Sequence, residues 1–325
     1  MKKNLILAFA LTIITTFSVN QLSAQTKEDA GNAFNAALEL YKNNNMAGAI
    51  IKMQEVVTMC TALGAEGDTI KMSAAKVIPA WQYNIGNNLK NEKKVELAIS
   101  AYEKSNEFAI LYADDNIKEK SENQLVMLYT NKGSTLLKAE KADSAMLFLD
   151  KALKLNPEYS KALFTKGQVC KKQGDNEKMV ENMELAIASA AKTNDTIIIK
   201  AAKNNIGNLR NQEGLTAYNK KMYGDAVSKL NTALSYGVKS KDLYYALSSS
   251  YNGLKKYDES IEAANAGLAL EEQTDLKLAR YYCEIAKAYE GKKDISNACE
   301  YYRKSAFGAY AAFSNDKIKN TLKCQ

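Results

Sequence analysis

Small residues recur along this chain with a period of 34 residues, and this period is the feature that most restricts the possible fold. From Gly133, further small residues follow twelve and nineteen positions on, at Ala145 and Ala152. The set begins again at Gly167, which is 167 − 133 = 34 residues after Gly133. A repeated helix–turn–helix unit needs small side chains where its two helices cross closely. The period therefore predicts an all-α chain of stacked helix pairs.

The same three-position spacing occurs seven times in the chain. The first positions are Ala37, Gly86, Gly133, Gly167, Gly214, Ser248 and Ala286. The second positions are Ala49, Ala98, Ala145, Met179, Ala226, Ser260 and Ala298, and the third are Val56, Ser105, Ala152, Ala186, Ala233, Gly267 and Ser305. Only Met179 and Val56 are not small. Seven matches in one chain indicate a repeat array and not a chance coincidence.

These residues resemble the tetratricopeptide repeat, whose small residues stand at repeat positions 8, 20 and 27. The corresponding repeats begin near Ala30, Pro79, Val126, Ser160, Gly207, Lys241 and Ala279. The resemblance implies an α-solenoid, a right-handed superhelix of helix–turn–helix repeats, over residues 25–313. The chain departs from the family pattern at position 32, where only Pro157 supplies the usual proline.

Three of the gaps between first positions are longer than 34 residues. They are 86 − 37 = 49, 133 − 86 = 47 and 214 − 167 = 47 residues. The extra residues open with related phrases at Asp68, Asp115 and Asp195, which offer side chains that cap helix starts. We expect each insertion to extend the first helix of its repeat by roughly 20 Å. Pro79 lies inside the first extension, so that helix is expected to be kinked or split in two.

The first residues of the chain have the pattern of a secretory signal peptide. Lys2 and Lys3 are basic, Leu5 to Phe17 is an apolar run, and polar or small residues follow. Cleavage after Ala24 is expected, although Leu22 is not the small residue preferred three positions before a cut. The mature chain is then expected to be exported, to the periplasm or outside the cell, without a transmembrane segment.

Composition excludes several classes of function. There is no His, which removes His-dependent catalytic triads and His metal ligands. No phosphate-binding glycine loop and no Cys-x-x-Cys motif is present. Without Lys2 and Lys3 the charge balance is 42 − 37 = +5, with both signs interspersed, which argues against a nucleic-acid partner. We therefore expect no cofactor and no catalysis; a carboxylate-based enzyme is the remote alternative.

Five cysteines leave at least one thiol unpaired in a monomer. Cys170 is expected to be a buried thiol because it occupies an apolar position of its repeat. Cys283 and Cys299 lie in opposite helices of the seventh repeat, and a bridge between them is conceivable. Cys324 near the C-terminus is an alternative partner for either of them.

In the family, positions 2, 5, 9 and 12 of each repeat face a concave groove. The resemblance implies that aromatic, amide and hydroxyl side chains at positions 5 and 9 line this groove. They are Tyr83, Asn87, Phe164, Gln168, Asn211, Tyr245 and Ser249. Rings supply contact area and amides bond a peptide backbone, so we expect a scaffold or adaptor that binds a protein or an extended peptide. The alternative is a binder of cell-wall glycan, with Tyr83, Phe164 and Tyr245 stacked on sugars.

One sub-class of the family is disfavoured. Its members grip a C-terminal carboxylate with Lys at position 5 and Asn at position 9, and here Asn87 follows Tyr83.

The last residues are expected to cap the array. Ile318 and Leu322 are four residues apart and share one face of a helix, so residues 314–325 are predicted to pack these two side chains on the seventh repeat.

Overall fold

The computed structural model describes residues 26–272 and 274–325, and every regular element within them is a helix. Residues 1–25, which include the predicted signal peptide, lie outside the described residues. Fourteen helices follow one another up to Ser305: α2 (Lys27–Lys42), α3 (Met46–Leu63), α4 (Asp68–Asn91), α5 (Val95–Leu111), α6 (Asp115–Lys138), α7 (Ala142–Leu155), α8 (Ser160–Gln173), α9 (Asn176–Lys192), α10 (Thr196–Asn219), α11 (Tyr223–Ser235), α12 (Lys241–Gly253), α13 (Tyr257–Leu268), α14 (Asp275–Gly291) and α15 (Ile295–Ser305). Short 3-10 turns at Gly64–Glu66 (η1) and Gly308–Tyr310 (η2), then α16 (Ala311–Asp316) and a π-helical turn at Lys317–Thr321 (η3), complete the described chain.

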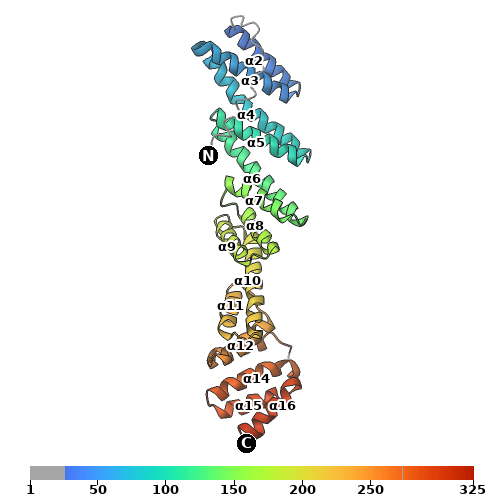
Figure 1. The fold of residues 1–325 in the computed structure, drawn as a ribbon, viewed down its shortest axis with the longest axis vertical. Coiled ribbons are helices and arrows are strands. Elements are labelled where there is room, and N and C mark those ends of the chain that lie inside the picture. Colours follow the sequence, from blue (N-terminus) through green and yellow to red (C-terminus); the bar gives the residue numbers. More distant parts are fainter. Residues whose placement is uncertain (1–25, 273) are drawn as a thin grey trace. The chain divides into compact units, whose positions relative to one another are not determined.

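The helices pair consecutively, each even-numbered helix with the one after it, and the predicted α-solenoid is confirmed (Figure 1). The chain divides into two compact units, Met1–Asn131 and Lys132–Gln325, and the division falls inside α6. Each unit has its own core. In the first, a cluster that includes Met53 and Ile78 joins α2, α3 and α4. In the second, successive clusters such as that of Leu230 and Leu243 join neighbouring pairs.

The periodic small residues lie at the helix crossings, and all of them are buried. A Cβ placed on Gly133 would lie 2.8 Å from Cγ of Leu149 in α7, and one on Gly214 would lie 2.7 Å from Leu230 in α11. At these two crossings the missing side chain of the glycine leaves the space that a large side chain of the second helix fills. The sixth repeat shows the complementary solution. There Ser248 stands at the first position, and the residue opposite is the small Ala264, which is also buried.

The three insertions lengthen helices as predicted. Helices α4, α6 and α10 are each 24 residues long and begin at the phrases identified in the sequence. The Asp195 carboxylate accepts a hydrogen bond from the Ile198 N–H at 3.1 Å, and Asp114 does the same for Ile117 at 3.0 Å. The prediction of a split at Pro79 is wrong, since α4 runs through this residue as one helix. Pro79 is buried and its carbonyl accepts a hydrogen bond from Ser105 of α5, so packing holds the helix together across the missing donor.

The turns within the helix pairs share a left-handed residue at repeat position 15. These residues are Asn44, Lys93, Glu140, Gly174, Lys221, Lys255 and Lys293, with φ between 59° and 80° in every case. Only one is glycine. A left-handed conformation costs a non-glycine residue roughly 1–2 kcal/mol, so the antiparallel packing of each pair imposes it against local preference.

The C-terminal residues fold back on the seventh repeat. Ile318 and Leu322 pack against Ala286, Ala298 and Tyr302, which is the contact predicted from the sequence. The α-helix of these residues, α16, begins at Ala311, which is earlier than the Ser314 cluster from which a helix was expected.

Cys299 is bonded to Cys324, with their Cα atoms 5.7 Å apart. The suggested bridge between Cys283 and Cys299 is therefore wrong, and Cys324 takes the role of partner. Cys60, Cys170 and Cys283 are buried free thiols.

One described segment, Met46–Glu66, is long and apolar enough by length and composition to cross a membrane, contrary to the expectation of none. One face of this segment, which includes Met53, Val56 and Cys60, is buried in the core formed with α2 and α4.

Candidate functional site

The seven residues predicted to line a groove are all partly exposed. They lie on the first helices of four repeats, on α4, α8, α10 and α12, and their environments differ. Tyr83 and Asn87 belong to the first unit, and the other five belong to the second.

In the first unit, Tyr83 and Asn87 are both tied to Tyr102 of α5. The rings of Tyr83 and Tyr102 lie 5.3 Å apart between centroids, and the Tyr102 hydroxyl donates a 2.7 Å hydrogen bond to Oδ1 of Asn87. Burial, with a smaller contribution from Tyr83, raises the pKa of Tyr102 to about 12. The Tyr102 hydroxyl is therefore a fixed donor at neutral pH, and it orients Asn87.

In the second unit, Phe164 packs against the cluster that contains Cys170 and Met183. Tyr245 lies between the rings of Tyr218 and Tyr281, at 6.1 and 6.2 Å between centroids. Asn211 differs from both, because its side-chain oxygen is buried and accepts no hydrogen bond.

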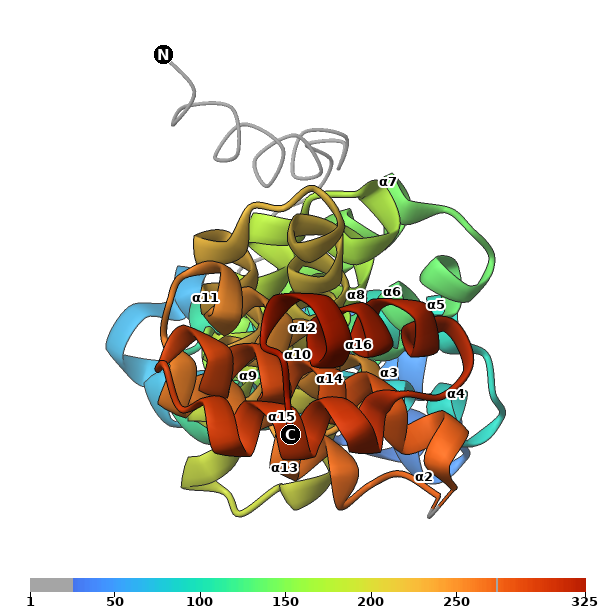
Figure 2. The same ribbon diagram turned by 90° about the horizontal axis from the view of Figure 1, so that it is seen from below.

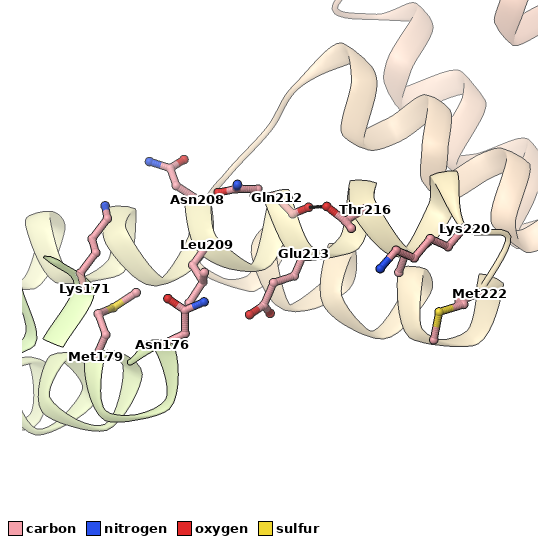
Figure 3. A pocket seen from close by; sticks show the side chains of 11 residues that line it. Lys171, Asn176, Met179, Asn208, Leu209, Gln212, Glu213, Thr216, Lys220 and Met222 are labelled. Atoms are coloured by element: carbon pink, nitrogen blue, oxygen red, sulfur yellow. Dashed lines mark hydrogen bonds between the residues drawn. The ribbon is translucent and has the colours of Figure 1, made fainter. Parts of the chain in front are cut away.

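A groove with a volume of about 560 Å³ runs along α10, next to the junction of the fourth and fifth repeats (Figure 3). We call it the α10 groove. Its lining comes from the end of α8, the start of α9, one side of α10 and the turn that follows: Lys171, Asn176, Met179, Asn208, Leu209, Gln212, Glu213, Thr216, Ala217, Lys220 and Met222.

The groove follows from the length of α10. The N-terminal half of this helix packs on α9, where Ala202 and Ile206 are buried against Met179. The C-terminal half packs on α11 instead, where Gly214 meets Leu230. Beside this C-terminal half, the fourth repeat contributes only Lys171 at the end of α8 and Asn176 and Met179 in α9 to the lining. The side of α10 towards these residues is left open as the wall of the groove.

Most side chains along this wall can form hydrogen bonds, and two are apolar. Leu209 lies among the exposed Asn208, Gln212 and Thr216 (Figure 3), and the buried Ala217 is the second apolar residue of the lining. The wall therefore combines apolar contact area with amide and hydroxyl groups on successive turns, which is the chemistry that holds an extended peptide.

The charge inside the groove is largely compensated. Glu213 accepts hydrogen bonds from Arg210 at 2.7 Å and pairs with Lys229 at 3.2 Å. Burial raises the pKa of Glu213, but the bonds and charges of these two partners outweigh it and hold the pKa below its usual value. Lys171 and Lys220 are exposed at the two ends. The lining is thus mildly basic.

Four segments of the chain match the family model for the tetratricopeptide repeat: 128–159, 160–193, 242–274 and 279–306. They coincide with the third, fourth, sixth and seventh helix pairs. The chain is a tetratricopeptide repeat protein. No curated protein matches its sequence.

Solved structures match the chain at low identity. YrrB, described as a TPR protein with an unusual peptide-binding site, is 16% identical, with 62% of this chain and 97% of that chain covered and a TM-score of 0.35. A tetratricopeptide repeat protein from Parabacteroides merdae is 12% identical, with 90% and 98% covered and a TM-score of 0.29. PilW, a type IV pilus biogenesis factor, is 15% identical, with 62% and 87% covered and a TM-score of 0.31.

The α10 groove lies on a different side of α10 from Asn211, the residue of this helix that was predicted to face a ligand. None of the seven predicted residues lines it, and two lining residues, Asn208 at position 2 and Lys171 at position 12, occupy repeat positions that were expected to face a ligand. The signal that could have located it was the 47-residue gap before Gly214, since the insertion creates the uncovered side.

Among the described residues, no group of three or more His, Cys, Asp or Glu side chains is arranged to hold a metal ion.

Proposed function

We propose that this tetratricopeptide repeat protein is a non-catalytic scaffold that binds an extended segment of a protein partner in the α10 groove. The observation that carries the proposal is an open groove about 560 Å³ in volume, whose α10 wall presents Leu209 beside exposed amide and hydroxyl side chains. An extended peptide presents a backbone amide at every residue, and Asn, Gln and Thr side chains can form hydrogen bonds with these amides. The mildly basic lining favours a neutral or acidic segment.

The second part of the proposal is that the predicted residues at positions 5 and 9 of the repeats also contact a bound protein segment. Asn211 supports it, because an asparagine oxygen buried without a donor is an acceptor that a bound N–H group would satisfy. Tyr245 and Phe164 support it less, since their rings already contact other side chains. The same ring contacts argue against the glycan alternative, which needs free ring faces for stacking on sugars.

We also propose that the protein is exported, on the strength of the basic start, the apolar run and the small residue at Ala24. N-terminal sequencing of protein recovered from cells by osmotic release tests this. Export predicts a mature chain that starts at or near Gln25; an intact Met1 contradicts it.

The groove is tested with substitutions at exposed positions that the fold tolerates. Gln212→Arg combined with Thr216→Arg fills the groove, while Asn204→Arg places a similar charge on the same helix outside the lining. Protein partners are captured from an envelope extract, with and without cell-wall sacculi, and the binding of the recovered partner is then measured by calorimetry.

We expect the double variant to lose at least tenfold in affinity for the partner, and the Asn204→Arg control to bind like the wild type. Equal binding by both variants contradicts the role of the groove. Recovery of sacculi without any protein partner would favour the glycan alternative instead.

A further inference from the structure

Residues 306–325 form a segment that covers part of the sixth and seventh repeats. It leaves α15 at Ser305, forms η2, α16 and η3, and returns to α15 through the disulfide of Cys299 with Cys324 (Figure 2). We call it the C-terminal segment. It is held to the same helix at both of its ends, by the main chain at one and by the disulfide at the other.

Four side chains of the C-terminal segment reach the repeats with the spacing i, i+3, i+4 and i+7. They are Tyr310, Phe313, Ser314 and Lys317. This is the spacing with which one face of a short helix fits a groove between other helices.

Each of these side chains has its own partner on the repeats. The Tyr310 hydroxyl donates to the hydroxyl of Tyr245 at 3.2 Å. The Lys317 ammonium group bonds Glu290 at 2.7 Å, and the other oxygen of Glu290 accepts from Tyr302 at 2.5 Å.

The middle of the segment is held by a ring and a hydroxyl. The ring of Phe313 lies edge-on to Tyr302, 6.0 Å between centroids, and the Lys287 ammonium group is 5.5 Å from its centre. The Ser314 hydroxyl, which is fully buried, lies 2.7 Å from that of Ser305.

Three of the five partners on the repeats occupy positions predicted to line a ligand groove, whereas Tyr302 and Ser305 lie on α15. Tyr245 is at position 5 of the sixth repeat, and Lys287 and Glu290 are at positions 9 and 12 of the seventh. These contacts are polar, cationic and aromatic, whereas a cap that only shields the last repeat needs apolar contact alone. Ile318 and Leu322 already supply that apolar contact.

We propose that the sixth and seventh repeats form a second binding surface, which the C-terminal segment occupies as an internal ligand while the Cys299–Cys324 disulfide is closed. When the disulfide is reduced, the surface accepts a helical protein segment with the same anchors, an aromatic residue at i, another at i+3 and Lys at i+7. This surface is separate from the α10 groove, and the proposal does not depend on what binds there.

The release step is a thiol–disulfide exchange with a dithiol. The dithiol gives up two electrons and two protons and is oxidised to its own disulfide, while Cys299 and Cys324 each become a thiol. Closing a short loop gives a tethered segment an effective concentration of roughly millimolar, so loss of one tether favours an external competitor.

The binding surface is tested with a fluorescent synthetic peptide of residues 308–320 and the full chain. The variant Tyr310→Ala/Phe313→Ala/Cys324→Ser disables the internal ligand and keeps Ile318 and Leu322. We expect saturable binding to this variant and none to the oxidised wild type. Adding Glu290→Gln to the variant, or Lys317→Gln to the peptide, should weaken binding at least fivefold, while Lys319→Gln in the peptide should leave it unchanged.

Binding to the variant no tighter than to the oxidised wild type overturns the proposal, as does equal loss from the Lys319→Gln and Lys317→Gln peptides. A second measurement needs no substitution and remains decisive if the variant does not fold. Amide hydrogen exchange of residues 308–322 in the wild-type chain should become at least tenfold faster after dithiothreitol treatment, while exchange in α14 stays the same. Unchanged exchange in the segment overturns the role of the disulfide.

Discussion

The crossing between α6 and α7 offers the sharpest test of how the periodic small residues act. A Cβ added at Gly133 would lie 2.8 Å from Cγ and 3.0 Å from Cδ2 of Leu149, which is fully buried. Overpacking of this kind costs about 1–3 kcal/mol. Replacing glycine by alanine inside a helix contributes about 1 kcal/mol in the opposite direction. Gly133→Ala should therefore destabilise the chain by up to about 2 kcal/mol, as the difference of these two effects.

The steric origin of this cost is isolated by removing the side chain opposite. Leu149→Ala alone should cost about 2–5 kcal/mol because it leaves a cavity. In that background both contacts with Leu149 are gone and only the Ala145 carbonyl oxygen, 3.3 Å from the added Cβ, stays close. Gly133→Ala should then stabilise the chain by up to about 1 kcal/mol through helix propensity. The coupling between the two substitutions is then about 1–3 kcal/mol. The double variant recreates the pairing of small residues that Ser248 and Ala264 make in the sixth repeat.

Stability is measured by chemical denaturation of the four proteins, followed by hydrogen exchange in α6 and α7, because long repeat arrays do not always unfold in one step. Gly31→Ala is the matched control, since a Cβ at this position of α2 meets nothing within 4 Å. The control should gain stability. If Gly133→Ala has the same effect with Leu149 and with Ala at position 149, the reasoning from close approach is refuted.

Three further predictions concern other parts of the chain. Burial raises the pKa of the Cys283 thiol to about 11, so at pH 8 about one Cys283 side chain in a thousand is a thiolate. Iodoacetamide should therefore modify Cys283 only after unfolding, and rapid labelling of the native chain would contradict its burial. The pKa of Glu213 is lowered in the folded state, so its carboxylate stabilises the fold fully above the unfolded pKa of about 4.3 and ceases to do so as the pH falls through the lower folded pKa. Glu213→Gln should therefore be less stable than the wild type in denaturation at pH 7 and more nearly equal to it at pH 3. A difference between variant and wild type that grows on acidification would contradict this prediction. Lys221→Gly relieves a left-handed residue, which costs about 1–2 kcal/mol, and loses about 0.5–1 kcal/mol through chain entropy, so it should raise stability by up to about 1.5 kcal/mol. Lys220→Gly next to it, where φ is −84°, should lower stability, and thermal melts that rank the two variants the other way would show that position 15 is not strained.

The sequence was sufficient for the helix pairs because their crossings depend on residue size. Where two helices approach closely, one side must lack a large side chain, and this requirement is visible as the spacing of Gly133, Gly167 and their counterparts. The lengthened helices were also predictable, since a thirteen-residue insertion without turn residues extends the helix that it precedes. The contact of Ile318 and Leu322 with the seventh repeat followed from helical spacing in the same way.

The tertiary structure alone decided which surfaces are open. The side of α10 that forms the groove mixes polar and apolar residues, like many covered helices, and its openness is a property of the folded chain. Tyr245 has the sequence pattern of a ligand-facing ring, yet Tyr310, 65 residues later, bonds to its hydroxyl. The pairing of Cys299 with Cys324 likewise depends on where the C-terminal segment folds. Local spacing fixes which residues of neighbouring helices meet, whereas exposure and long-range pairing depend on elements distant in the chain, which the pattern of a single repeat does not contain.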